Sequence, residues 1–106
     1  MIYQNKLLVL KILLENISSK SMFGFLRPSI YMAETGTFFS TARLDIKKKE
    51  IEPRESEVLR IILESPSGFG EHLKKGAVLS VRNGLDEIGR ALVLEIEGYW
   101  EDLNSL

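Results

Sequence analysis

Residues 76–96 read Gly-Ala-Val-Leu-Ser-Val-Arg-Asn-Gly-Leu-Asp-Glu-Ile-Gly-Arg-Ala-Leu-Val-Leu-Glu-Ile. The dipeptide Asn83-Gly84 separates two apolar runs, and its residue types adopt positive φ at little steric cost. Such a dipeptide between apolar runs is the strongest short-range signal for a β-hairpin. The stretch therefore predicts two antiparallel strands, at residues 76–82 and 87–96, joined by a tight turn.

Four further segments with strand-like patterns precede this hairpin, at residues 6–15, 28–34, 37–46 and 56–64. The even-numbered residues of the first form one almost wholly apolar strand face, although a buried helix fits its composition nearly as well. The last segment, which follows Ser56, is as fair a helix as a strand when taken alone. The turn signals between the segments favour strands. The predicted fold class is all-β: a single small closed six-stranded antiparallel β-barrel, which leaves no open sheet edge.

Length and charge narrow the range of functions. The chain has 106 residues, of which 44% are hydrophobic and 27% charged, so we expect one domain at 1–106. The strands lie within residues 6–96, and residues 97–106 form a short C-terminal extension in which Tyr99 and Trp100 fold back on the surface. Fourteen basic and fifteen acidic residues leave a formal charge of −1, so no overall field attracts phosphate-rich partners.

The rare residue types exclude several kinds of site. Without cysteine there is no disulfide and no thiolate metal site, and one histidine makes the usual metal clusters unexpected. The apolar run near the N-terminus is interrupted by Lys11 and is too short to span a membrane. We therefore expect a cytoplasmic protein without membrane contact, metal or cofactor.

Several motifs stand in the order in which they occur in a known family. These are Arg27-Pro28, Thr35-Gly36, Pro53, the run from Leu79 to Gly84, and Ile88-Gly89. In this order and at nearly this spacing, they resemble the C-terminal (third) β-barrel domain of elongation factor Tu and related translation GTPases. The chain departs from the family at Arg54, where the family has glycine, so a positive-φ turn is not expected at that position.

The resemblance implies a set of binding residues. In the full-length factors the third domain touches the T-stem of aminoacylated tRNA and packs on the other two domains. Carried over by motif position, the RNA-facing side is made of Ser29, Thr35, Arg82 and Asn83, with Arg27 and Arg82 as phosphate-holding groups. The alternative is structural, with Arg27 and Arg82 bonded to acidic side chains or loop carbonyls at the barrel ends. Those acidic side chains are Glu34 and Glu87.

Two other features have a surface or core interpretation beside a binding one. The run Lys47-Lys48-Lys49 is either a solvated loop or a phosphate-contacting patch. Tyr31, Phe38 and Phe39 are either core and cross-strand residues or platforms for nucleic-acid bases.

Catalytic motifs are absent from the sequence. There is no Gly-x-x-x-x-Gly-Lys-Ser/Thr loop, so GTP binding and hydrolysis are not expected on this chain. His72 lies in a loop-like segment without a catalytic arrangement around it, and we expect it to face solvent.

The sequence therefore predicts a stand-alone, non-enzymatic binding module. Its expected partner is a protein related to translation, with the module as regulator, decoy or antagonist. Two alternatives are an RNA-binding module for tRNA-like stems and a detached subunit of a split translation factor.

Overall fold

The first strand shows why the chain is extended rather than helical. In β1, Leu8–Asn16, every even-numbered side chain is buried, whereas Lys11 and Glu15 are exposed. That alternation has a period of two, which places one row of side chains inside the barrel and the other outside. The structure, a computed structural model, describes residues 3–24, 26–46 and 50–103.

Five strands and two short helices follow β1. The strands are β2 (Ser29–Met32), β3 (Phe38–Asp45), β4 (Ser56–Leu63), β5 (Val78–Asn83) and β6 (Asp86–Tyr99). The helices are the 3-10 helix η1 (Pro66–His72) and α1 (Trp100–Leu103). Within the described part of the chain, no helix has the length and apolar character that crossing a membrane requires.

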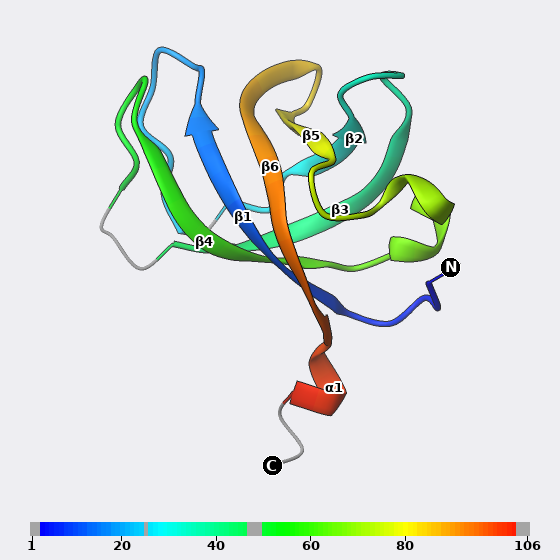
Figure 1. Cartoon of the computed structure of the whole chain (residues 1–106). Coiled ribbons are helices and arrows are strands. Elements are labelled where there is room, and N and C mark those ends of the chain that lie inside the picture. Colours follow the sequence, from blue (N-terminus) through cyan, green and yellow to red (C-terminus); the bar gives the residue numbers. More distant parts are fainter. Residues whose placement is uncertain (1–2, 25, 47–49, 104–106) are drawn as a thin grey trace.

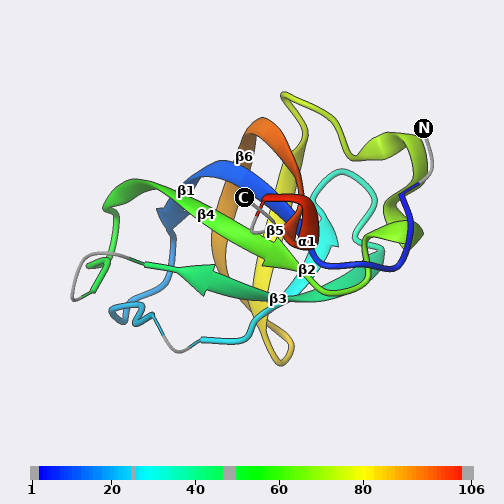
Figure 2. The same ribbon diagram turned by 90° about the horizontal axis from the view of Figure 1, so that it is seen from below.

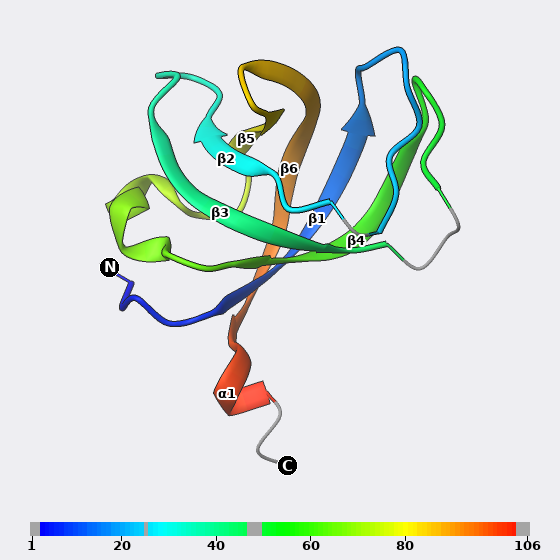
Figure 3. The same cartoon turned by 180° about the vertical axis from the view of Figure 1, so that it is seen from behind.

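The six strands close into a barrel in the order β1-β4-β3-β2-β5-β6, and each neighbouring pair is antiparallel. Figure 1 shows β4, β1 and β6 side by side, and Figure 3 shows β2 and β3 on the opposite wall. Helix α1 lies below the strands in Figure 1, and in the view from below in Figure 2 it lies in front of them. The predicted closed, antiparallel, six-stranded barrel is confirmed.

The two segments with an ambiguous period pair with each other. β1 and β4 share a register that runs from Leu8 opposite Leu63 to Glu15 opposite Ser56. In β4 the buried positions Leu59, Ile61 and Leu63 alternate with more exposed ones. A helix would give up these ladder bonds and turn apolar side chains to water, so tertiary pairing decides for strand.

Aliphatic side chains, most of them from the strands, fill the barrel interior together with the aromatic ring of Phe69. Phe69 of η1 is fully buried and belongs to this core, although its element lies outside the sheet. Each such side chain stabilises the fold by roughly 1.5–3 kcal/mol relative to exposure. Ser40 of β3 is also buried, and its hydroxyl accepts a hydrogen bond from the Ser65 N–H at 2.9 Å.

The hairpin turn is displaced by one residue from the predicted position. Asn83 is the last residue of β5 and pairs with Asp86, so the two loop residues are Gly84 and Leu85. Gly84 has φ 65°, while Leu85 is not among the residues with positive φ. A glycine at the first loop position matches the II′ type of hairpin turn, which needs positive φ only there.

The turn at Pro53-Arg54 corrects a second expectation. Arg54 has φ 70° although it is not glycine. Its N–H donates to the Asn16 carbonyl at 2.8 Å, and the Glu55 N–H donates to the Glu52 carbonyl at 3.0 Å. These bonds hold the left-handed conformation, which costs an ordinary side chain about 1–2 kcal/mol.

The C-terminal region also departs from expectation. Strand β6 continues to Tyr99, three residues beyond the predicted end at 96, because two bulges against β1 bring Leu8 opposite Tyr99. The Tyr99 hydroxyl accepts a hydrogen bond from the Gln4 N–H at 2.9 Å, whereas Trp100 remains 43% exposed. The segment that contains His72, expected to be loop-like, ends the 3-10 helix η1.

Candidate functional site

A buried asparagine organises one end of the barrel. Asn16, at the end of β1, is fully buried, and its amide donates to the carbonyls of Lys20 and Ile51 at 2.8 and 2.9 Å. Its side-chain oxygen accepts from the N–H and the hydroxyl of Ser18 at 2.9 and 2.8 Å. All four bonding positions of this amide are used, so residues 16–22 fold tightly against the barrel end.

A groove lies between this loop and the β5–β6 hairpin. It has a volume of about 360 Å³ and is lined by residues 18–22, Leu26, Asn83 and residues 86–88. A bulge forms its inner wall: Val81 pairs with Gly89 and Arg82 with Glu87, which leaves Ile88 as the extra residue. The Ile88 carbonyl accepts the Ile17 N–H at 3.0 Å, so the hairpin and the loop are bonded to each other.

Glycine is required where the hairpin approaches β1. A Cβ placed on Gly89 would lie 2.9 Å from the Met22 methyl carbon and 3.0 Å from the Glu15 carbonyl oxygen. The methyl group is able to move, but the backbone oxygen is not. Gly89 therefore lets β6 pass close enough to β1 to place the hairpin beside residues 18–22.

Apolar side chains at this end face solvent. Leu85, at the tip of the hairpin, is 94% exposed. Phe23 and Ile17, in the loop that follows β1, are 46% and 41% exposed. An exposed leucine at a turn tip is not explained by the turn itself, which requires only the preceding glycine.

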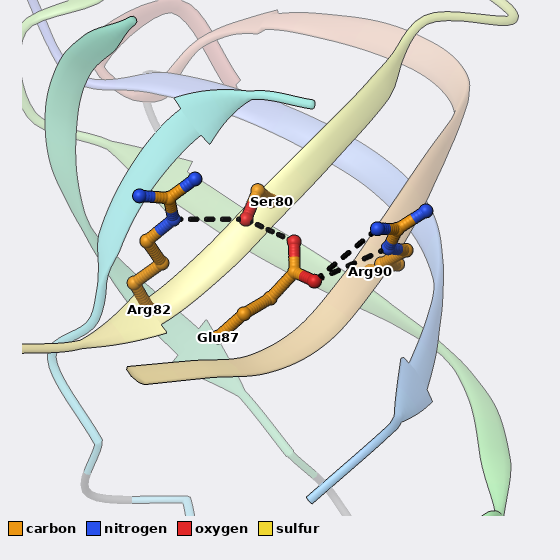
Figure 4. Close-up of polar contacts among 4 residues, drawn as sticks. All are labelled: Ser80, Arg82, Glu87 and Arg90. Atoms are coloured by element: carbon orange, nitrogen blue, oxygen red, sulfur yellow. Dashed lines mark hydrogen bonds and ion pairs between the residues drawn. The ribbon is translucent and has the colours of Figure 1, made fainter. Parts of the chain in front are cut away.

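The outer face of β2, β5 and β6 carries a polar cluster made of Tyr31, Ser80, Arg82, Glu87 and Arg90. Figure 4 shows Ser80 between Arg82 and Glu87, and Arg90 on the far side of the carboxylate. Arg82 donates from Nε to the Ser80 hydroxyl oxygen at 3.2 Å, and the Ser80 hydroxyl donates to Glu87. The Arg82 guanidinium also lies over the Tyr31 ring, 4.1 Å from its centroid, which is cation–π geometry.

The carboxylate of this cluster is held in its charged form. The hydrogen bond from Ser80 lowers the pKa of the Glu87 carboxyl below its ordinary value of 4.5, and the charges of Arg90 and Arg82 act in the same direction. Partial burial opposes this effect without reversing it. The Arg82 charge is thus compensated by a carboxylate that it reaches through Ser80, which is the structural role that the sequence left open for Arg82.

The five predicted binding residues do not form one site. Ser29 and Arg82 are directly opposite each other in the β2–β5 ladder. Asn83 instead lines the groove, because successive residues of a strand point to opposite faces. Arg27 is exposed just before β2. Thr35 lies beyond the other end of β2, where its hydroxyl oxygen accepts the Thr37 N–H at 3.3 Å as part of a turn.

The structure describes only part of the remaining predicted features. Lys47, Lys48 and Lys49 lie outside the described residues, as do the side chains of Phe38 and Phe39. His72 is exposed, as predicted. Among the described residues, no three acidic or histidine side chains are arranged to hold a metal ion.

The hairpin end of the barrel therefore combines a groove, an exposed leucine and an arginine whose charge is compensated, and it is the candidate site. The sequence matches no protein-family model and no curated protein. The resemblance to elongation factor Tu accordingly stays a prediction.

Three residues that shape this end were not identified from the sequence. Asn16 reads as the start of a polar loop, Ser80 as one member of an apolar run, and Leu85 as the residue after a turn. Signals for two of them exist in hindsight: a polar residue at an inward position of a strand must find partners, and a large apolar residue at a turn tip is unusual.

Proposed function

We propose that the chain is a non-enzymatic protein-interaction module of the elongation factor Tu C-terminal type, which presents its hairpin end to a translation-related protein in the cytoplasm. The observation that carries this proposal is Leu85, 94% exposed at the tip of a hairpin that borders a groove. A projecting leucine beside a concave, partly polar surface provides the apolar anchor and the adjoining recess that protein interfaces use.

The charges at this end favour a protein over RNA. Two carboxylates, Asp86 and Glu87, and one cation, Lys20, line the groove, and the excess of negative charge repels phosphate groups. Arg82 is engaged by Tyr31 and Ser80 and compensated through Glu87. With Thr35 at the other end of β2, the residues predicted to face RNA do not form a continuous basic track, which binding to a stem needs.

Binding to purified elongation factors and to aminoacylated tRNA, measured by biolayer interferometry at low and moderate salt, tests the proposal. We expect protein binding that persists in moderate salt and falls about 30-fold for Leu85→Ser, which corresponds to about 2 kcal/mol for a buried anchor. Asn83→Ala should weaken the same binding. The matched control Leu103→Ser changes an exposed leucine of α1, 41% exposed, and should have no effect.

Two results would reject the proposal. If folded Leu85→Ser and Asn83→Ala bind the partner as tightly as the parent, the hairpin end is not the contact surface. If tRNA is bound, elongation factors are not, and the affinity disappears in moderate salt, the chain is an RNA-binding module instead.

A further inference from the structure

A second exposed apolar feature crosses the outside of the barrel. The strand registers place Val58 opposite Leu13, Leu13 opposite Leu92, and Leu92 opposite Val78. These four residues, here called the apolar stripe, come from β4, β1, β6 and β5 in that order, and Figure 1 shows β4, β1 and β6 adjacent along the barrel wall. Val58 is 51% exposed, Val78 40% and Leu92 37%, and Leu13 is half-buried.

The side chains of the apolar stripe lie on the barrel surface and do not fill the barrel interior. Its members point away from the core, and on either side of Leu13 along β1 the inward neighbours Ile12 and Leu14 are fully buried. It is also separate from the groove and from Leu85, which lie at the hairpin end. Four apolar residues at directly paired cross-strand positions are neighbours on one face, which indicates a continuous patch rather than scattered exposure.

Four charges surround the centre of the stripe in an alternating square. On one side, Lys11 of β1 lies opposite Glu95 of β6. On the other side, Glu15 of β1 lies opposite Arg90 of β6. All four side chains are exposed. Around Leu13 and Leu92 the signs therefore alternate: positive and negative in one row, negative and positive in the other.

We propose that the apolar stripe binds a second copy of this chain in a two-fold symmetric dimer. A two-fold interface brings a surface against itself, so the pattern must be complementary to its own rotated copy. With the axis along the strands, Lys11 meets Glu95 and Glu15 meets Arg90 of the other copy. With the axis along the stripe, Lys11 meets Glu15 and Glu95 meets Arg90. Opposite charges face each other in both cases, with leucines against leucines between them.

The same square fits other partners less well. A uniformly acidic or basic surface would place two of the four charges against like charges, and a lipid or apolar peptide would offer an opposite charge to none of them, so that Arg90 would keep only Glu87 of its own chain. The four stripe residues and the four charges are far fewer than the roughly 20–30 residues per side of a standard interface, so the expected dimer is weak and depends on concentration.

Sedimentation equilibrium of the full chain from micromolar to millimolar concentration measures this association directly. The expected result is a monomer–dimer equilibrium. Leu92→Lys and Lys11→Glu should each raise the dissociation constant at least tenfold, because each places a charge against leucine or against a like charge. Leu103→Lys, a matched change of an exposed leucine in α1, should leave the equilibrium unchanged. Circular dichroism and thermal melting establish that each variant is folded.

Double charge swaps provide the decisive test. If the axis runs along the strands, Lys11→Glu with Glu95→Lys restores association; if it runs along the stripe, Lys11→Glu with Glu15→Lys restores it. Restoration by one of the two swaps supports the proposal. A folded chain that stays monomeric at millimolar concentration, or a loss by Lys11→Glu that neither swap restores, overturns it, and neither result bears on binding at the hairpin end.

Discussion

The two ends of β1 are stabilised in different ways. At its C-terminal end, Asn16 is fully buried and bonds to two carbonyls and to Ser18. At its N-terminal end, Lys6 forms an exposed ion pair with Glu101 at 2.7 Å, and the Trp100 N–H donates to the Leu7 carbonyl at 2.8 Å. One end is held by a dry polar network, and the other by contacts that water competes for.

That difference favours the end of the barrel near Asn16 as the location of the candidate binding surface. A binding groove needs walls that keep their shape, and the buried amide of Asn16 fixes residues 18–22 against the barrel. The exposed contacts at the other end contribute little, because surface ion pairs are worth about 0–1 kcal/mol. The candidate site thus lies at the end whose loops are internally bonded.

Replacing Asn16 should produce the largest effect. Asn16→Ala removes the four hydrogen bonds of a buried amide, two to the carbonyls of Lys20 and Ile51 and two from Ser18, and leaves the Ser18 N–H without its acceptor. We therefore expect a loss of about 2–3 kcal/mol in the free energy of unfolding. Urea denaturation measures it. The matched control is Asn5→Ala at the other end, where the exposed Asn5 accepts bonds from Ser67, and the expected change is below about 0.5 kcal/mol. Equal losses for the two variants would remove the distinction between the ends.

Gly89 should be the next most sensitive position. Gly89→Ala forces a methyl group against the Glu15 carbonyl oxygen at 3.0 Å, and we expect a cost of about 2 kcal/mol from overpacking. Gly84→Ala is the control, because Gly84 has φ 65° but no atom within 4 Å of an added Cβ. It should cost about 1 kcal/mol through backbone strain alone. A smaller cost at Gly89 than at Gly84 would show that the close approach is easily relaxed.

Arg54 should respond in the opposite direction. Arg54→Gly removes the strain of a left-handed conformation, which should stabilise the fold by about 1–2 kcal/mol. Glycine also raises the entropy of the unfolded chain, which should destabilise the fold by about 0.5–1 kcal/mol. The net expectation is a gain of about 0.5–1 kcal/mol in thermal and urea unfolding. A loss would mean that the Arg54 side chain makes a contribution larger than the strain of its backbone.

The fold followed from local patterns because those patterns are set by the backbone. The even-numbered apolar positions of β1 and the glycine in the last hairpin each act within a few residues. They predict the number of strands, the order of the strands along the chain, and which face of a strand is buried. The one-residue error at Asn83 arose because Asn-Gly and Gly-Leu are both acceptable turn pairs, and pairing with β6 chose between them.

The site was harder to predict because it depends on contacts distant in sequence. Asn16 meets Ile51, and Arg82 meets Tyr31, only after the barrel has closed. Motif positions gave Ser29 and Arg82 as a pair, which the ladder places together, but they also gave Thr35, which it places apart. Arg54 was misjudged since residue type alone does not reveal the neighbouring hydrogen bonds that hold it.

The smallest predicted effect separates the two ends by pH. The pKa of Glu87, near the hairpin, is lowered by its hydrogen bond from Ser80, so its contribution to stability is present above 4.5 and is lost as the pH falls through the lowered value. The pKa of Lys6 is raised above 10.5 by its hydrogen bond to Glu101, so its contribution is present below 10.5 and is lost as the pH rises through the raised value. The hairpin end should therefore weaken in acid and the terminal end in alkali.

The free energy of unfolding in urea, measured as a function of pH for the parent chain, Glu87→Gln and Lys6→Met, tests this difference. Glu87→Gln should flatten the acid limb of the stability curve and leave the alkaline limb as it is, whereas Lys6→Met should do the reverse. The alkaline limb should not vanish in Lys6→Met, because burial raises the pKa of Tyr3 and that group titrates in the same window. If Glu87→Gln leaves the acid limb unchanged, Ser80 and Arg90 do not hold the carboxylate in solution. Glu87 would still carry its charge at neutral pH, but Ser80 would not link it to Arg82, and the Arg82 guanidinium would be free to contact a phosphate group.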